Sequence, residues 1–99
     1  MQEMSMSEFT YPGTEKWPNQ GSYGGFNYSF KNGWVVSLAA GGNDKQTLCF
    51  VSFRGLVHDI REVMGNPTPD EYDDKRYLNR REITSLFERV STLPDRALR

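Results

Sequence analysis

Two side chains in this sequence could do chemistry on their own, the single histidine and the single cysteine. His58 stands beside Asp59 and four residues before Glu62, so a helix would place His58 and Glu62 on one side, where they could hold a metal ion weakly. Zinc sites use three or four protein ligands, and no further ligands occur at a suitable spacing. We therefore predict no metal site and no cofactor, and a His58 that faces solvent at the start of a helix.

Cys49 could act as a nucleophile only if a base such as His58 lay within hydrogen-bond reach. Nothing in the spacing of the two residues selects that arrangement. Cys49 stands between Leu48 and Phe50 in an apolar run, where a free cysteine behaves as a small buried hydrophobe. A single cysteine also cannot form an intramolecular disulfide. The sequence therefore predicts a protein without catalytic residues.

A charged segment supplies the candidate partner-binding residues: Asp70, Glu71, Tyr72, Asp73, Asp74, Lys75, Arg76, Tyr77, Arg80 and Arg81. Its acidic part lacks the glycine and the alternating oxygen ligands of a calcium loop. It suits either the first turn of a helix or a negative patch that engages a basic protein groove or mimics DNA. Its basic part, with two tyrosines nearby, could bind single-stranded nucleic acid by charge and stacking, although the neighbouring carboxylates cancel much of that field.

Composition limits the classes of function. The chain has 99 residues and a net charge of −1, with both signs interspersed. This predicts one small domain and argues against a general polyanion-binding protein. No apolar run is long enough to span a bilayer, and no signal-peptide pattern occurs. We therefore expect a cytoplasmic protein.

The elements that must position these residues are organised around a predicted antiparallel meander with strands at 26–30, 34–38 and 47–53. Asn32-Gly33 favours a two-residue type I′ turn, but that register mixes polar and apolar residues on both faces. A three-residue loop with a left-handed Gly33 keeps the large side chains on one face. Its pairs are Phe30 with Trp34, Tyr28 with Val36, Phe26 with Leu38, Leu38 with Cys49, Val36 with Val51 and Trp34 with Phe53. We predict this second register, because a one-residue slip would move every side chain to the wrong face.

The second face of this meander holds a small apolar patch of Val35, Leu48 and Phe50. The region 1–25 is predicted to be an irregular N-terminal arm, rich in turns and carrying Phe9, Tyr11 and Trp17. Two alternatives remain open for these aromatic residues. They fold back over the second face, or they form an adaptable arm that orders on a partner. If the patch stays bare, it is a contact site or the interface of a homodimer.

After Arg54-Gly55 the apolar period changes from 2 to 3.6. A first helix is predicted over 56–64, ending at Gly65, and a short charged surface helix over 68–78 with Thr68 as its N-cap. A third helix opens with the capping box of Asn79 and Glu82. Its apolar stripe is Ile83, Leu86, Phe87 and Val90, and Leu93-Pro94 ends it. The fold class expected is therefore α+β, with the three-stranded antiparallel meander packed on two to three C-terminal helices. One domain spans 26–94, and 95–99 is a loose tail.

One stretch resembles a known group of proteins. Tyr23-Gly24-Gly25, followed by Phe30-Lys31-Asn32-Gly33-Trp34-Val35-Val36-Ser37, is similar to the F-x-N-G-x-x-V-S hairpin of small proteins encoded by tailed bacteriophages and prophages. This resemblance implies an accessory protein that binds a host protein or complex in the host cytoplasm, as anti-CRISPR inhibitors of bacterial defence do. It transfers no active-site residue.

Three functions are therefore weighed. The first is a non-catalytic protein-binding module, of the phage or mobile-element inhibitor type, that acts by steric occlusion in a host–virus interaction. The second is a small nucleic-acid-binding or regulatory protein that uses the basic 75–81 segment. The third, an enzyme or an enzyme subunit, has the least support, because only Cys49 and His58 could serve it.

Overall fold

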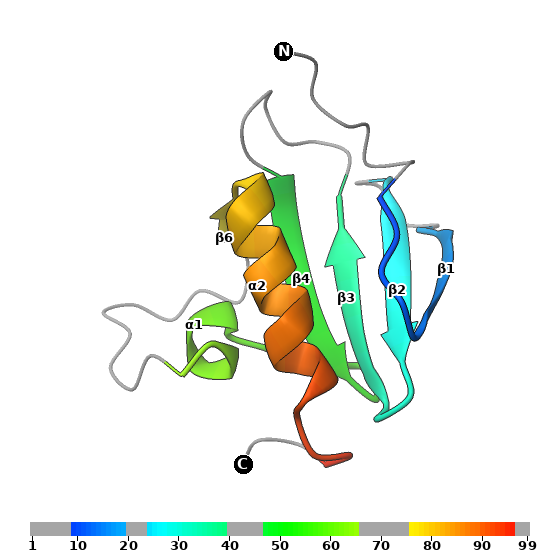
Figure 1. Cartoon of the computed structure of the whole chain (residues 1–99), viewed down its shortest axis with the longest axis vertical. Coiled ribbons are helices and arrows are strands. Elements are labelled where there is room, and N and C mark those ends of the chain that lie inside the picture. The colour runs from blue at the N-terminus through cyan, green and yellow to red at the C-terminus, as the bar shows by residue number, and fades with distance from the viewer. Residues whose placement is uncertain (1–8, 20–23, 40–46, 66–75, 97–99) are drawn as a thin grey trace.

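The computed structural model describes residues 9–19, 24–39, 47–65 and 76–96. Figure 1 shows an antiparallel sheet with the long helix α2 lying against one face. The elements, in chain order, are β1 (Thr14–Pro18), β2 (Phe26–Phe30), β3 (Trp34–Leu38), β4 (Thr47–Phe53), β5 (Leu56–His58), α1 (Ile60–Val63), β6 (Arg76–Leu78) and α2 (Arg80–Ser91). The strand order is β1-β2-β3-β4-β5, and β6 pairs with β4 beside β5. The protein is thus a small α+β fold, with a larger sheet than predicted and, among the described residues, less helix.

The predicted meander forms β2, β3 and β4 in the predicted register. Phe26 lies opposite Leu38 and Tyr28 opposite Val36, and the β3–β4 pairs are also those expected. Gly33 has a φ of 93° and its N–H donates to the Phe30 carbonyl at 3.1 Å, which is the left-handed position that the three-residue loop requires. The face toward α2, here called the inner face, is therefore lined by buried residues.

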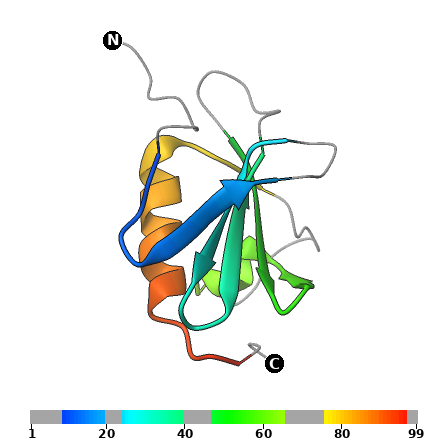
Figure 2. The same cartoon turned by 90° about the vertical axis from the view of Figure 1, so that its right-hand side faces the viewer.

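The N-terminal region contains a strand that the sequence analysis did not predict. β1 pairs antiparallel with β2 along its whole length (Figure 2). Phe9 and Tyr11 pack against Phe87 of α2, with ring centroids 5.1 and 5.3 Å away. These two residues therefore complete the inner-face core, and the expectation that they cover the second face is wrong. Only Trp17 lies on the second face, because it stands opposite Asn27 in the β1–β2 register.

The predicted helix over 56–64 is wrong for its first half. Phe53 and Leu56 are paired across a two-residue turn, Arg54-Gly55, so residues 56–58 form β5 beside β4. Both turn residues have positive φ, as a type I′ turn requires. The chain then makes only the short helix α1, whose N-cap is Asp59: its side chain accepts a hydrogen bond from the Arg61 N–H at 2.8 Å.

The predicted surface helix over 68–78 is wrong at its end, where residues 76–78 form β6. This strand pairs with the start of β4, Thr47 opposite Leu78 and Cys49 opposite Arg76. Other predictions lie outside the described residues: the frayed start at 1–8, the polar turn at 41–46, the helix start at Thr68 to Glu71 and the last residues of the tail, 97–99.

The third predicted helix is confirmed as α2. The Asn79 side chain accepts from the Glu82 N–H at 2.8 Å, and the Glu82 carboxylate accepts from the Asn79 N–H at 2.9 Å, which completes the capping box. The predicted stripe of Ile83, Leu86, Phe87 and Val90 is buried. Trp34 is buried beneath the C-terminal end of the helix region, where its Nε1 donates to the Pro94 carbonyl at 2.8 Å.

Candidate functional site

The predicted partner-binding segment does not form one helix. Residues 70–75 lie outside the described residues, and Arg76 belongs to β6 rather than to a helix. Tyr77 is exposed on β6, while Arg80 and Arg81 are exposed in the first turn of α2. Arg76 and Arg80 therefore belong to different elements, with the N-cap Asn79 between them.

The face of the sheet away from α2, here called the outer face, collects the remaining exposed aromatic residues. Strand alternation and the registers place Trp17 opposite Asn27, Ser37 opposite Phe50, and Leu48 opposite Tyr77 on this face. A second row runs from Glu15 and Ser29 through Val35 and Ser52 to Val57. In the described strands, the outer face therefore carries one charged residue, Glu15, and no basic residue.

Exposure on the outer face is greatest at its two ends. Trp17 is 41% exposed on β1, while Val57 and Tyr77 are 38% and 52% exposed at the opposite edge. Val35 and Phe50 are half-buried, and Leu48 is buried. Val35, Leu48 and Phe50 therefore lie on the second face, as predicted. The more exposed residues of this face, Val57 and Tyr77, lie at its edge.

A neutral polar band separates these two apolar ends. It consists of Asn27, Ser29, Ser37 and Ser52, which alternate with core residues on β2, β3 and β4. The Ser37 hydroxyl donates to the Asn27 side-chain carbonyl, so the band is partly ordered by its own hydrogen bonds. The outer face thus offers apolar anchors around a set of hydrogen-bonding groups without charge.

His58 is placed differently from the prediction. It ends β5, it is only 7% exposed, and its ring packs against that of Trp34 with centroids 5.0 Å apart. The predicted solvent-facing position is wrong, because the Arg54-Gly55 turn folds residues 56–58 back onto β4. Its Nε2 is buried without a hydrogen-bond partner, so neither a substrate nor a metal ion in solvent reaches this atom in the described fold.

Cys49 is buried, as predicted, and its thiol donates to the Thr47 carbonyl at 3.3 Å. Burial, together with the smaller effect of the negative charge of Glu82, raises the pKa of Cys49 to about 12. The thiol is therefore protonated at neutral pH, and a protonated thiol is a poor nucleophile. Among the described residues, no group of three or more histidine, cysteine or acidic side chains could hold a metal ion.

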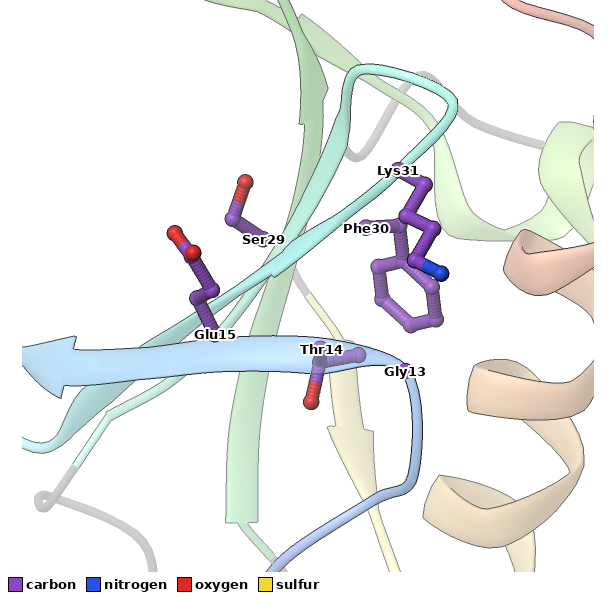
Figure 3. Close-up of a pocket in the computed structure, with 6 residues that line it drawn as sticks. All are labelled: Gly13, Thr14, Glu15, Ser29, Phe30 and Lys31. Carbon is purple, nitrogen blue, oxygen red and sulfur yellow. The ribbon is translucent and has the colours of Figure 1, made fainter.

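A partly open hollow of about 430 Å³ lies at the end of the β1–β2 pair (Figure 3). Its lining residues are Gly13, Thr14, Glu15, Ser29, Phe30 and Lys31. Glu15 and Ser29 point to one side of the strands, and Phe30 and Lys31 point to the other. The polar groups do not converge, so the hollow provides no pair of groups for acid–base chemistry.

Sequence reasoning missed Val57 as a surface residue, because it assigned Val57 to a helix stripe. The overlooked signal was Arg54-Gly55. Two residues with glycine second, between Phe53 and Leu56, match the shortest hairpin turn. Trp17 was named as a candidate, but its strand was not recognised.

In the part of the chain that the structure describes, no helix is long and apolar enough to cross a membrane. Comparison with protein-family models, with curated protein sequences and with solved structures gave no match.

Proposed function

We propose that this protein is a non-catalytic binding module that docks a partner protein on the outer face of its sheet and blocks that partner sterically. The observation that carries this proposal is the composition of the outer face. Its exposed side chains are Trp17, Val57 and Tyr77, around a neutral polar band. The cores of protein interfaces are depleted in charge and enriched in aromatic residues, and tryptophan and tyrosine are frequent energetic hot spots.

The packing of the other face supports the same reading. Tyr28, Trp34 and Phe87 are fully buried under or within α2, so the inner face supplies most of the domain's core. Exposed apolar residues on the outer face are not needed to complete that core. Exposed tryptophan and tyrosine residues that the core does not need are suited to contact a partner.

The partner proposed here is a protein rather than a nucleic acid. Nucleic-acid affinity depends on neutralising phosphates with lysine and arginine, and the described outer face has none. Arg80 and Arg81 are exposed in the first turn of α2, the helix that covers the inner face. Stacking and charge are therefore not combined on one surface, as single-stranded nucleic acid would require.

The resemblance to phage-encoded accessory proteins contributes one point to this proposal: the partner is a host protein or complex. The hairpin residues that carry it have structural roles. Asn32 bonds to the end of α2, Gly33 has a positive φ, and Val36 is buried. These structural roles account for the resemblance of the hairpin. The proposed recognition surface is the outer face.

The test begins with capture of partners from a bacterial lysate on immobilised protein, with identification by mass spectrometry. The purified partner is then titrated calorimetrically with the wild type, with Trp17→Ala and with Glu88→Gln as control, since Glu88 is exposed on α2. We expect Trp17→Ala to weaken binding by about tenfold or more, which corresponds to about 1.4 kcal/mol. Glu88→Gln should bind as the wild type does. Equal affinity of Trp17→Ala and wild type, or salt-sensitive binding to oligonucleotides alone, would overturn the proposal.

A further inference from the structure

The strands β5 and β6 form one interrupted edge strand. Both are antiparallel to β4 and lie on the same side of it, β5 beside Val51 to Phe53 and β6 beside Thr47 to Cys49. They therefore run in the same direction, one after the other, with a gap opposite Phe50. The chain leaves the sheet after His58 and returns in line at Arg76.

The backbone groups of this edge can be assigned from the ladder. The Ala39 N–H donates to the Leu48 carbonyl at 2.9 Å, so the even-numbered residues of β4 bond to β3. Backbone direction alternates along a strand, so the odd-numbered residues of β4 bond to β5 and β6. Val57 lies opposite Ser52 and Tyr77 opposite Leu48. The N–H and C=O groups of Val57 and Tyr77 therefore point away from β4, toward the side on which no described strand lies.

Among the described residues, the opposite edge of the sheet carries more protecting residue types than this one. β1 contains Lys16 and Pro18, residue types that discourage further strand pairing. The β5–β6 edge contains one arginine, Arg76, but no lysine and no proline, and it carries Leu56, Val57 and Tyr77, which are 60%, 38% and 52% exposed. A strand edge with exposed apolar side chains and outward backbone groups is a template for another strand.

The spacing along this edge is self-complementary. Val57 and Tyr77 are level with Ser52 and Leu48, and each of these is two residues from Phe50 on β4. A two-fold axis level with Phe50 therefore places Val57 of one copy opposite Tyr77 of a second copy, and the reverse. Two-fold pairing of identical surfaces is the commonest arrangement in homo-oligomers.

We propose that two copies of this chain pair antiparallel through their β5–β6 edges and form one continuous sheet. In this register, Val57 and Tyr77 of the two copies exchange backbone hydrogen bonds as narrow pairs. Their side chains form a valine–tyrosine pair on the outer face of each half, a combination that stabilises strand pairing. Leu56 meets Leu78 of the second copy on the inner-face side, which covers the most exposed apolar residue described.

This pairing also extends the proposed recognition surface. The outer faces of the two copies become one surface, with a Trp17 residue near each end and the Val57–Tyr77 pairs at its centre. The dimer itself depends only on the β5–β6 edge, so it can be tested without any partner protein.

The test uses the full chain in analytical ultracentrifugation over a concentration series. We expect the wild type to reach twice the chain mass. Tyr77→Lys should weaken association by about tenfold or more, since it removes the contact with Val57 of the second copy and places a lysine on the edge strand. The matched control is Trp17→Lys, which changes an exposed aromatic residue at the other edge. This variant should dimerise as the wild type does, but it should lose the partner binding proposed above. A wild type that stays monomeric, or a dimer that Trp17→Lys weakens and Tyr77→Lys does not, would overturn the proposal.

A second measurement addresses the backbone directly. Amide hydrogen exchange is followed by NMR at low and high protein concentration. We expect the N–H groups of Val57 and Tyr77 to become at least about tenfold more protected as the dimer forms, because both donate across the interface. Protection that does not change with concentration at these two positions would contradict the assigned edge, even if a dimer forms elsewhere.

Discussion

Asn32, in the turn between β2 and β3, holds the end of α2: its Nδ2 donates to the Val90 carbonyl at 2.8 Å. The same amide group donates to the Leu93 carbonyl at 2.9 Å, and its Oδ1 accepts from the Trp34 N–H at 3.2 Å. The last carbonyls of a helix have no partner within the helix. A turn residue distant in sequence thus caps α2 and ties the hairpin to the helix.

We expect Asn32→Ala to lower the free energy of unfolding by about 2 kcal/mol, because it removes three hydrogen bonds, two to carbonyls at the end of α2 and one from the Trp34 N–H. Urea unfolding followed by circular dichroism measures the change. The adjacent Lys31→Ala, at an exposed position, should stay within about 0.5 kcal/mol of the wild type. Equal effects of the two substitutions would show that the Asn32 contacts contribute nothing to stability.

Substitutions at Gly25 and Gly13 distinguish the cost of a steric clash from the cost of a positive φ. Their φ values are 83° and 84°, but a Cβ on Gly25 would lie 1.9 Å from the Leu38 carbonyl oxygen, whereas a Cβ on Gly13 would meet nothing within 4 Å. We expect Gly13→Ala to cost about 1 kcal/mol, and Gly25→Ala to cost at least about 2 kcal/mol more. Thermal melting of both variants measures the difference. Similar melting temperatures would mean that the entry to β2 does not approach β3 as described.

The turn at Arg54-Gly55 offers a stabilising substitution. Arg54 has a φ of 52° in the first position of a type I′ turn, where asparagine is preferred. The Arg54 guanidinium also lies 5.1 Å from the centre of the Phe53 ring. We expect Arg54→Asn to raise stability by about 0.5 kcal/mol, and Arg54→Ala to lower it by a similar amount, since alanine loses the ring contact and keeps the strained backbone. Chemical unfolding of the three proteins gives the order. The account of this turn is wrong if asparagine is no more stable than alanine.

Alkaline pH should destabilise this protein. Burial and, to a smaller extent, the negative charge of Glu82 raise the pKa of Cys49 from 9.0 to about 12, and burial raises the pKa of Tyr28 from 10.0 to about 12. Both groups lose their protons more easily when the chain is unfolded. Their contribution is therefore complete below pH 9 and is lost as the pH rises toward 12.

Urea unfolding at pH 8, 9, 10 and 11 measures this loss, which we expect to reach about 2–4 kcal/mol by the highest of these values. In Cys49→Ala the loss should begin about one pH unit later, near the ordinary pKa of tyrosine. The native thiol should also resist alkylation at pH 8 and react once urea unfolds the chain. An identical pH profile in wild type and Cys49→Ala would exclude Cys49 as a contributor.

The strongest local patterns predicted their elements correctly. The register of β2 to β4 followed from the alternation of large side chains between Phe26 and Phe53, since only one register buries all of them on one side. The start of α2 followed from the capping box of Asn79 and Glu82. In both cases the decisive interaction joins residues that are close in sequence or that alternate regularly.

The incorrect predictions concern elements decided by distant contacts. The apolar residues from Leu56 to Met64 fit a helical period, but a short apolar run can equally form a strand, and pairing with β4 decided between the two. β6 exists because residues 76–78 pair with Thr47 to Cys49, which no local pattern records. The positions of Phe9 and Tyr11 against Phe87 were not predictable either, since aromatic residues in a turn-rich segment have no period.

The candidate surface was predictable in part for the same reason. The second face of the meander was expected to carry an apolar patch, and Val35 and Phe50 lie there half-buried. The exposed residues at its ends, Trp17 and Val57, belong to two strands that were not predicted. The outer face could therefore be identified only once the sheet extended beyond the meander on both sides.

The most direct test of the recognition surface is site-specific photo-crosslinking in the lysate that contains the partner. Trp17 is replaced by the aromatic crosslinker p-benzoylphenylalanine in one protein, and Glu88 on α2 is replaced by it in another. The account predicts a crosslinked partner protein from position 17 and none from position 88. Adducts from position 88 alone would contradict the assignment of recognition to the outer face.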